Sequence, residues 1–390
     1  MVFGGMAAIA VAVIVLSWGD GGGPNESTTT GASTIAEGET GSTTGPTTTT
    51  TAIEATVGYP GPLQNSEMVF HPALGGVVMF GGRDAGAMTG ETWIYDVIGD
   101  TWREATGTLT PSPRLGFGMA LVESSDEVVV IGGSAMPTGQ CSRRVARSAG
   151  PVDVWFLDAS LNWRHGESPE PPSDRWGQAI AAVPDSEAIV LFGGTGTEFD
   201  RLQSDLLGDT WIYTPSDGEW RQVSTGEGPE PRLCARMAAD AGTGLIYLWG
   251  GATESQAGDP TLWAFDPRTE IWQAVAVTGE APEARWLHQL VYEPESKLLY
   301  LIGGQWYQKT SIAAGTATQL EASDETWAFD PATSEWRLLA PVPGPISAHA
   351  AAPTGDGRIV VFAYQSTVVY DPVLDTWQDR TPSDVLDQDH

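Results

Sequence analysis

Three sequence marks recur in a fixed order along residues 62–380, and this repetition constrains the fold more than any other feature of the chain. An apolar run ends in a glycine pair, an aromatic segment follows and ends in an acidic residue, and a second tryptophan comes eight or nine residues after the first. The glycine pairs end at Gly82, Gly133, Gly194, Gly251 and Gly304. A sixth, degenerate copy ends its apolar run at Tyr364 and continues to Asp371 and Trp377. A period of roughly 53 residues predicts an array of similar structural units.

Each unit contains four short stretches that are typical of β-strands, here lettered A to D in chain order. Strand A follows an arginine, strand B is the apolar run before the glycine pair, strand C carries the first tryptophan, and strand D begins at the second. The glycine pair indicates a place where no side chain fits or where φ is positive. Proline-rich turns at 111–114, 229–232 and 282–285 join strand D of one unit to strand A of the next. A lone four-stranded sheet cannot bury both of its faces, so we expect the sheets to pack radially.

These marks resemble the kelch repeat, and the resemblance covers residues 62–380. It implies an all-β fold, a six-bladed β-propeller of kelch-type four-stranded blades, for which we predict the bounds 57–390. The family usually closes its ring by mixing strands from both ends of the chain in one blade. Here the sixth unit is complete through Trp377, but the sequence of residues 53–56 is similar to that of residues 103–106, which belong to a strand D. Either segment could therefore complete the last blade.

The N-terminal part of the chain has a different composition from the repeats. Residues 2–18 are apolar apart from glycine and one serine, and residues 27–51 are dominated by serine and threonine. We predict a signal peptide or signal anchor at 1–19 and a disordered Thr/Ser/Gly-rich linker at 20–56. The alternative for the apolar run is a buried core element. The first interpretation predicts an extracellular or cell-surface protein, tethered by this segment or secreted after its cleavage.

The charge of the chain excludes several classes of partner. The formal net charge is −31, with 19 basic and 50 acidic side chains, and residues 62–390 carry −26 of it. Nucleic acid and anionic membrane surfaces repel such an excess of carboxylates, so we expect membrane contact only through the N-terminal segment. The predicted partner is an unidentified protein or glycan, and the sequence does not predict an oligomeric state.

Candidate binding residues lie in the B–C and D–A connections, which the resemblance places on one face around a central channel. From the second glycine to the first tryptophan, the B–C connections of the first five units vary from 11 to 23 residues, which is typical of binding loops on a rigid scaffold. The candidates are four arginines at D–A turns and three tryptophans outside the repeat positions: Arg114, Arg175, Arg232, Arg285, Trp176, Trp286 and Trp306. Such groups suit carboxylates or sugar rings, and the alternative is that each arginine ties blades together by hydrogen bonds.

The second B–C connection holds a basic cluster, Arg143, Arg144 and Arg147, beside one of the two cysteines, Cys141. The cluster could bind an anionic partner or pair with carboxylates of the protein itself. The second cysteine, Cys234, follows Arg232 on the same expected face, and export would permit a Cys141–Cys234 disulfide.

The sequence does not contain a recognisable catalytic constellation. The alternative function is that of a secreted carbohydrate-active enzyme, similar to galactose oxidase or a sugar-isomerising propeller. The copper pattern of galactose oxidase, two His, two Tyr and a crosslinked Cys, is not matched. His288 and His349 occupy equivalent positions in strand A of neighbouring units and could form a weak metal site or simply pack. We therefore predict a non-catalytic binding module, with no catalytic residue, metal or cofactor; a self-packing surface protein is a third possibility.

Overall fold

The computed structural model describes residues 55–386 apart from 85–86, 108, 135–151, 197–205, 225, 255–258 and 313–314. The predicted signal segment and nearly all of the predicted linker lie outside these residues. Within the described part of the chain, no helix is both long and apolar enough to span a membrane.

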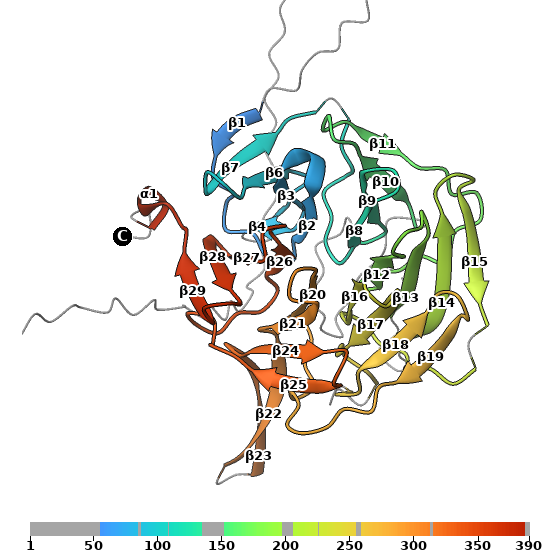
Figure 1. The fold of residues 1–390 in the computed structure, drawn as a ribbon, viewed down its shortest axis with the longest axis vertical. Coiled ribbons are helices and arrows are strands. Elements are labelled where there is room, and N and C mark those ends of the chain that lie inside the picture. Colours follow the sequence, from blue (N-terminus) through green and yellow to red (C-terminus); the bar gives the residue numbers. More distant parts are fainter. Residues whose placement is uncertain are drawn as a thin grey trace, which may run out of the picture. The chain divides into compact units, whose positions relative to one another are not determined.

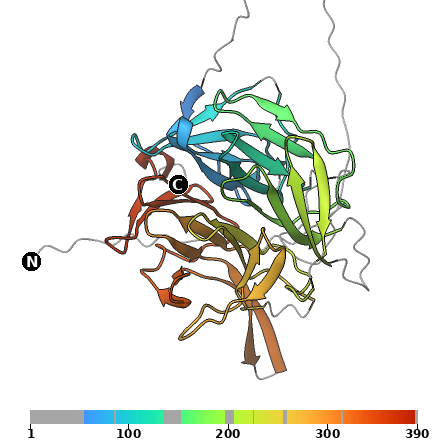
Figure 2. The same cartoon turned by 45° about the vertical axis from the view of Figure 1, so that its right-hand side comes forward.

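The described chain forms six antiparallel sheets arranged radially around a central axis (Figure 1). In every sheet strand A lies innermost, and each strand A contacts the strands A of both neighbouring blades, which closes the ring. This arrangement confirms the predicted all-β, six-bladed propeller. A turned view shows the sheets from the side (Figure 2).

The strands have the following bounds. Blade 1 contains β2 (Glu67–His71), β3 (Gly76–Phe80), β6 (Thr92–Asp96) and β7 (Thr101–Ala105). Blade 2 contains β8 (Gly118–Val122), β9 (Glu127–Ile131), β10 (Val154–Leu157) and β11 (Trp163–His165). Blade 3 contains β12 (Ala179–Ala182), β13 (Ile189–Thr195), β14 (Leu206–Thr214) and β15 (Glu219–Val223). Blade 4 contains β16 (Arg236–Asp240), β17 (Leu245–Trp249), β18 (Trp263–Asp266) and β19 (Ile271–Ala274).

Blade 5 contains β20 (Gln289–Glu293), β21 (Leu298–Ile302), β24 (Thr326–Asp330) and β25 (Glu335–Leu338), and blade 6 contains β26 (Ala350–Pro353), β27 (Ile359–Ala363), β28 (Ser366–Asp371) and β29 (Thr376–Asp379). Five strands lie outside this pattern: β1 (Ala55–Gly58), the hairpin of β4 (Arg83–Asp84) and β5 (Ala87–Met88), and the hairpin of β22 (Gln305–Ile312) and β23 (Gly315–Ala322). Two short helices complete the fold, η1 (Pro72–Leu74) and α1 (Ser383–Leu386).

Aromatic side chains fill the spaces between blades. Trp163 of blade 2 packs against Phe80 of blade 1, with ring centroids 5.1 Å apart, and donates its Nε1 hydrogen to Thr92 of blade 1 at 3.1 Å. Trp272 of blade 4 makes the equivalent bond to Thr210 of blade 3 at 2.9 Å. The repeated tryptophan of strand D thus joins neighbouring blades, because its ring buries apolar area and its N–H finds a partner there.

The glycine pairs are required by the seam between blades. Both glycines of the Gly250–Gly251 pair have positive φ, 69° and 89°. A Cβ on Gly250 would lie 2.6 Å from the carbonyl oxygen of Arg285 and from a ring carbon of His288, both in the next blade. The second glycine donates its N–H to the Arg285 carbonyl at 3.0 Å, and the same bond recurs from Gly82 to Arg114, from Gly194 to Arg232 and from Gly304 to Ile346.

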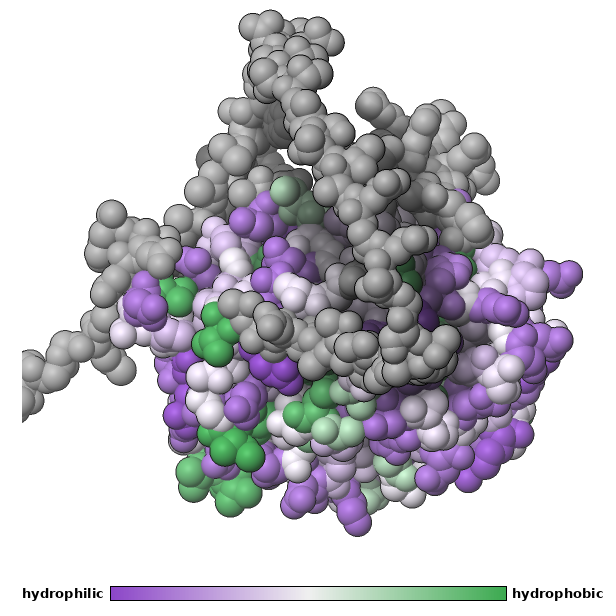
Figure 3. All heavy atoms as spheres, turned by 90° about the horizontal axis from the view of Figure 1, so that it is seen from above, coloured by the Kyte–Doolittle hydropathy of each residue, from purple (hydrophilic) through white to green (hydrophobic). Residues whose placement is uncertain are grey.

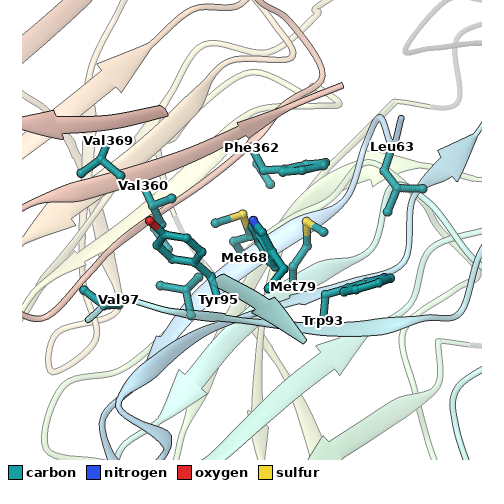
Figure 4. Close-up of a cluster of buried hydrophobic side chains, with 13 residues drawn as sticks. Leu63, Met68, Met79, Trp93, Tyr95, Val97, Val360, Phe362 and Val369 are labelled. Atoms are coloured by element: carbon teal, nitrogen blue, oxygen red, sulfur yellow. The ribbon is translucent and has the colours of Figure 1, made fainter. Parts of the chain in front are cut away.

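The ring closes without exchanging a strand between the chain ends. Blade 6 takes all four strands from its own unit, and β1 pairs antiparallel with β7 as a fifth, outer strand of blade 1. Across the seam between blades 6 and 1, Leu63 bridges Tyr364, and Thr367 bonds both Trp102 Nε1 at 3.0 Å and the Tyr59 hydroxyl at 2.8 Å. Side chains of both blades form the core behind these bonds (Figure 4).

We predict that Gly250→Ala destabilises the propeller by about 3 kcal/mol, because a Cβ there collides with backbone as well as facing a positive φ. Gly244→Ala is the matched control, since Gly244 has φ 76° but no atom within 4 Å of the added Cβ. Its cost should be about 1 kcal/mol. Urea unfolding followed by tryptophan fluorescence measures both; equal losses would contradict the packing explanation.

Candidate functional site at the channel mouth

The B–C and D–A connections meet on one face, where a repeated ion pair holds them together. In blades 2 to 5 the arginine of the D–A turn pairs with an acidic residue two to four positions before the strand-C tryptophan of the same blade. The pairs are Arg114–Asp153 at 2.7 Å, Arg175–Asp209 at 2.7 Å, Arg232–Asp259 at 2.8 Å and Arg285–Glu325 at 2.6 Å. The first tryptophan of strand C donates its Nε1 hydrogen to the same carboxylate, as from Trp211 to Asp209 at 2.6 Å.

The four guanidinium groups are buried and fully occupied. Arg175 also donates to the carbonyl oxygens of Gly193 at 3.1 Å and Ser173 at 3.1 Å, and its side chain is completely buried. The partner carboxylate keeps 20% of its side chain exposed. Burial raises the pKa of Asp209, but hydrogen bonds and the charge of Arg175 outweigh it, so this pKa is lowered overall. The arginines thus organise the connections of their own blades, and ligand contact by them stays a prediction.

The predicted tryptophans surround the channel mouth. Trp176 and Trp286 are buried in an apolar cluster with Cys234, Leu287 and Ala348. Trp306, at the base of the β22–β23 hairpin, is partly buried and lies over the Arg285 guanidinium, 5.0 Å from its carbon to the ring centroid. The structure therefore brings three of the predicted residues to one place, although only Trp306 keeps a partly exposed ring.

The basic cluster Arg143, Arg144 and Arg147 lies outside the described residues, as does Cys141. Cys234 lines the channel with a left-handed φ of 55° and is disulfide-bonded. With its predicted partner outside the described residues, the Cys141–Cys234 bond stays a prediction.

Six residues with a left-handed backbone conformation, one in each blade, form a ring around the channel. The sequence did not predict this ring. Its members are Asn65, Gly116, Gly177, Cys234, Leu287 and Ala348. Amide-to-carbonyl bonds of 2.7 to 3.0 Å join members from neighbouring blades: Gly177 to Gly116, Cys234 to Gly177, Ala348 to Leu287, and Asn65 to Ala348. Only the two glycines, each two residues after an arginine, could have signalled this ring.

Below this ring an ion pair crosses the channel. Arg236 of blade 4 lies 2.7 Å from Glu67 of blade 1, the blade on the opposite side of the ring. Burial raises the pKa of Glu67, and the charge of Arg236 opposes that rise only in part. A cavity of about 20 Å³ that Glu67 and Arg236 help to line has room for roughly one ordered water. A ligand on this face is therefore expected to bind at the mouth, above the ion pair.

His288 and His349 are packed between blades. Both rings are completely buried, and each lies against the first glycine of the preceding blade, Gly250 or Gly303. Among the described residues, no group of three His, Cys, Asp or Glu side chains is arranged to hold a metal ion.

Comparison with known proteins places this geometry in a family. Residues 139–363 match the family described as the KLHDC2/KLHL20/DRC7 Kelch-repeats domain, so the chain belongs to the kelch-repeat propellers. Adagio-like protein 1 of Oryza sativa subsp. japonica is 26% identical over 249 residues, 59% of this chain and 37% of that protein. Multiple epidermal growth factor-like domains protein 8 of Mus musculus is 27% identical over 197 residues, 49% of this chain and 6% of that protein. The matched region spans little more than a third of the Adagio-like relatives.

We predict that Arg175→Gln destabilises the protein by about 3 kcal/mol or more, because it leaves the partly buried Asp209 carboxylate without its counter-charge. Arg221→Gln is the control, since Arg221 pairs with Glu270 on the surface with 56% of its side chain exposed. The loss of unfolding free energy in Arg221→Gln should stay below about 1 kcal/mol. Chemical denaturation of both variants measures the difference, and similar small losses would argue against a structural role of the buried arginines.

A second prediction concerns pH. Burial lowers the pKa of His349 to about 3 and that of His288 well below its ordinary value. Below about pH 6.5 the unfolded chain therefore binds protons that the folded chain does not, so the free energy of unfolding falls as the pH falls. At pH 5 each histidine contributes up to about 2 kcal/mol of this loss.

The test compares urea unfolding at pH 7.5 and pH 5 for the wild type and for His288→Gln with His349→Gln. Glutamine fits this position, because Gln178 occupies it in blade 3 and donates to the Ile131 carbonyl at 2.8 Å. The double variant should lose most of the pH dependence between these values. If the double variant keeps the full pH dependence of the free energy of unfolding, that dependence comes from other titratable groups.

Proposed function

We propose that the chain is an exported propeller, held at a membrane by its N-terminal segment, that binds a protein or a glycan through the B–C and D–A face. Kelch propellers commonly serve as protein-binding modules, which supports the binding role. The disulfide-bonded Cys234 supports an oxidising location outside the cytosol. The apolar run at 2–18 and the Ser/Thr-rich segment after it support the tether.

The observation that carries the binding role is the unequal length of the B–C connections on one face of a regular ring. In blade 5 the B–C connection forms the β22–β23 hairpin, which projects beyond the ring (Figures 1 and 2). In blade 6 the same connection is only two residues long, between Ala363 and Ser366. Uneven loops on a rigid scaffold are where binding residues concentrate. Among the described residues on the side drawn in Figure 3, hydrophilic surface predominates and hydrophobic residues form small groups.

The test probes the full-length chain against a glycan array and an array of cell-surface proteins. Replacing residues 307–320 by a short turn should weaken binding of the best ligand by about tenfold or more, because the hairpin forms part of the face. The hairpin is a separate two-stranded sheet, so its shortening leaves the blade sheets intact. Val373→Ser with Leu374→Ser is the control, since both side chains are exposed on the opposite face. Equal binding by all three proteins would overturn the assignment of the face.

A further inference from the structure

Tyr364 lies in the shortest B–C connection of the six blades. Ala363 pairs with Ser366, so Tyr364 and Gln365 alone connect β27 to β28. The neighbouring blade 5 carries the β22–β23 hairpin at this point, and blade 1 carries the short β4–β5 hairpin. A chain approaching the channel mouth over blade 6 therefore has hairpins on both sides.

The backbone at Tyr364 is one that glycine occupies elsewhere in the ring. The first glycine of each pair has φ between 57° and 69° and the second has φ between 89° and 101°, whereas Tyr364 has φ 60° and bridges Leu63 of blade 1. A tyrosine in this left-handed region destabilises the fold relative to glycine. Its side chain does not recover the loss by burial, because 53% of the residue is exposed. Packing within the propeller therefore accounts for less than half of the surface of this residue.

The charges around this entrance indicate the kind of partner. The arginines of the face are buried, whereas their carboxylate partners reach solvent; Glu325 keeps 37% of its side chain exposed against 1% for Arg285. In blade 1 the exposed Glu91 accepts a hydrogen bond from Trp93 Nε1, and Leu63 occupies the position of the arginine of blades 2 to 5. The β4–β5 hairpin carries one opposing charge, the half-buried Arg83. With a propeller of net charge −26, these groups favour a basic partner.

We propose that the partner is a protein that crosses blade 6 as a basic segment, and that Tyr364 is its principal contact on the propeller. The tyrosine ring presents a π-face to a lysine or arginine side chain. The segment then reaches the mouth between the two hairpins, near Trp306. This proposal rests on the proposed function and narrows it to one class of partner and one point of entry.

The test starts from a random 12-residue peptide display library selected on the full-length chain. Enriched peptides are synthesised, together with versions in which each Lys or Arg is Gln, and their dissociation constants are measured by fluorescence anisotropy. We expect basic peptides, a loss of about tenfold or more on Tyr364→Gly, retention on Tyr364→Phe, and a similar loss for the Gln peptides. Tyr364→Gly should also raise the Tm by roughly 1–2 °C, so lost binding will not reflect unfolding.

Ser334→Gly is the matched control, because Ser334 is an uncharged residue with φ 59° in a C–D turn on the opposite face. It should remove backbone strain without changing peptide affinity. Peptides that bind Tyr364→Gly as tightly as the wild type overturn the proposal; if the same peptides are lost on shortening the β22–β23 hairpin, the proposed function still stands. Enriched peptides without basic residues, or no enrichment at all, also overturn it. Ligands found only on the glycan array would leave the proposed binding role intact and refute a protein segment.

Discussion

The hydrogen bond from the second glycine of a pair to a carbonyl of the next blade, present at Gly82, Gly194, Gly251 and Gly304, is the interaction on which the ring depends. It fixes the distance between neighbouring blades at the channel, because the donor and acceptor are both backbone atoms at the inner end of a sheet. The bond requires positive φ at both glycines and bare backbone at the first. The tryptophans can bury their rings between blades only after this spacing is set.

The buried arginines show why residue type alone does not define a binding site. Arginine beside tryptophan is typical of carboxylate or sugar recognition, yet here each guanidinium is enclosed by carbonyls and a carboxylate of its own blade. As a result, the guanidinium group is buried and its carboxylate partner is exposed, so this face presents negative charge to solvent. A face whose sequence suggests an anion receptor therefore presents carboxylates to solvent.

Much of the fold could be predicted from the sequence, because the repeat reports local backbone requirements. Glycine pairs and spaced tryptophans mark strand ends and blade contacts, and both lie where they were expected. The closure of the ring could not be predicted, since residues 53–56 and 103–106 have the same strand pattern and do not specify a neighbour. The Glu67–Arg236 pair depends on two residues far apart in sequence that face each other across the channel, which no local pattern reveals. Tyr364 was visible as a departure from the repeat, but its exposure requires the two-residue turn to be known.

Each blade is built from one continuous stretch of chain, with β1 added to the outside of the first. Five of the six seams are consequently crossed by the polypeptide itself. Among the described residues, the seam between blades 6 and 1 is held by hydrogen bonds, by the Arg380–Asp100 ion pair at 3.2 Å and by packed side chains. The backbone therefore connects neighbouring blades everywhere except between blade 6 and blade 1. Opening that seam would leave every strand paired within its own sheet, and the seam lies beside the shortest B–C connection of the chain.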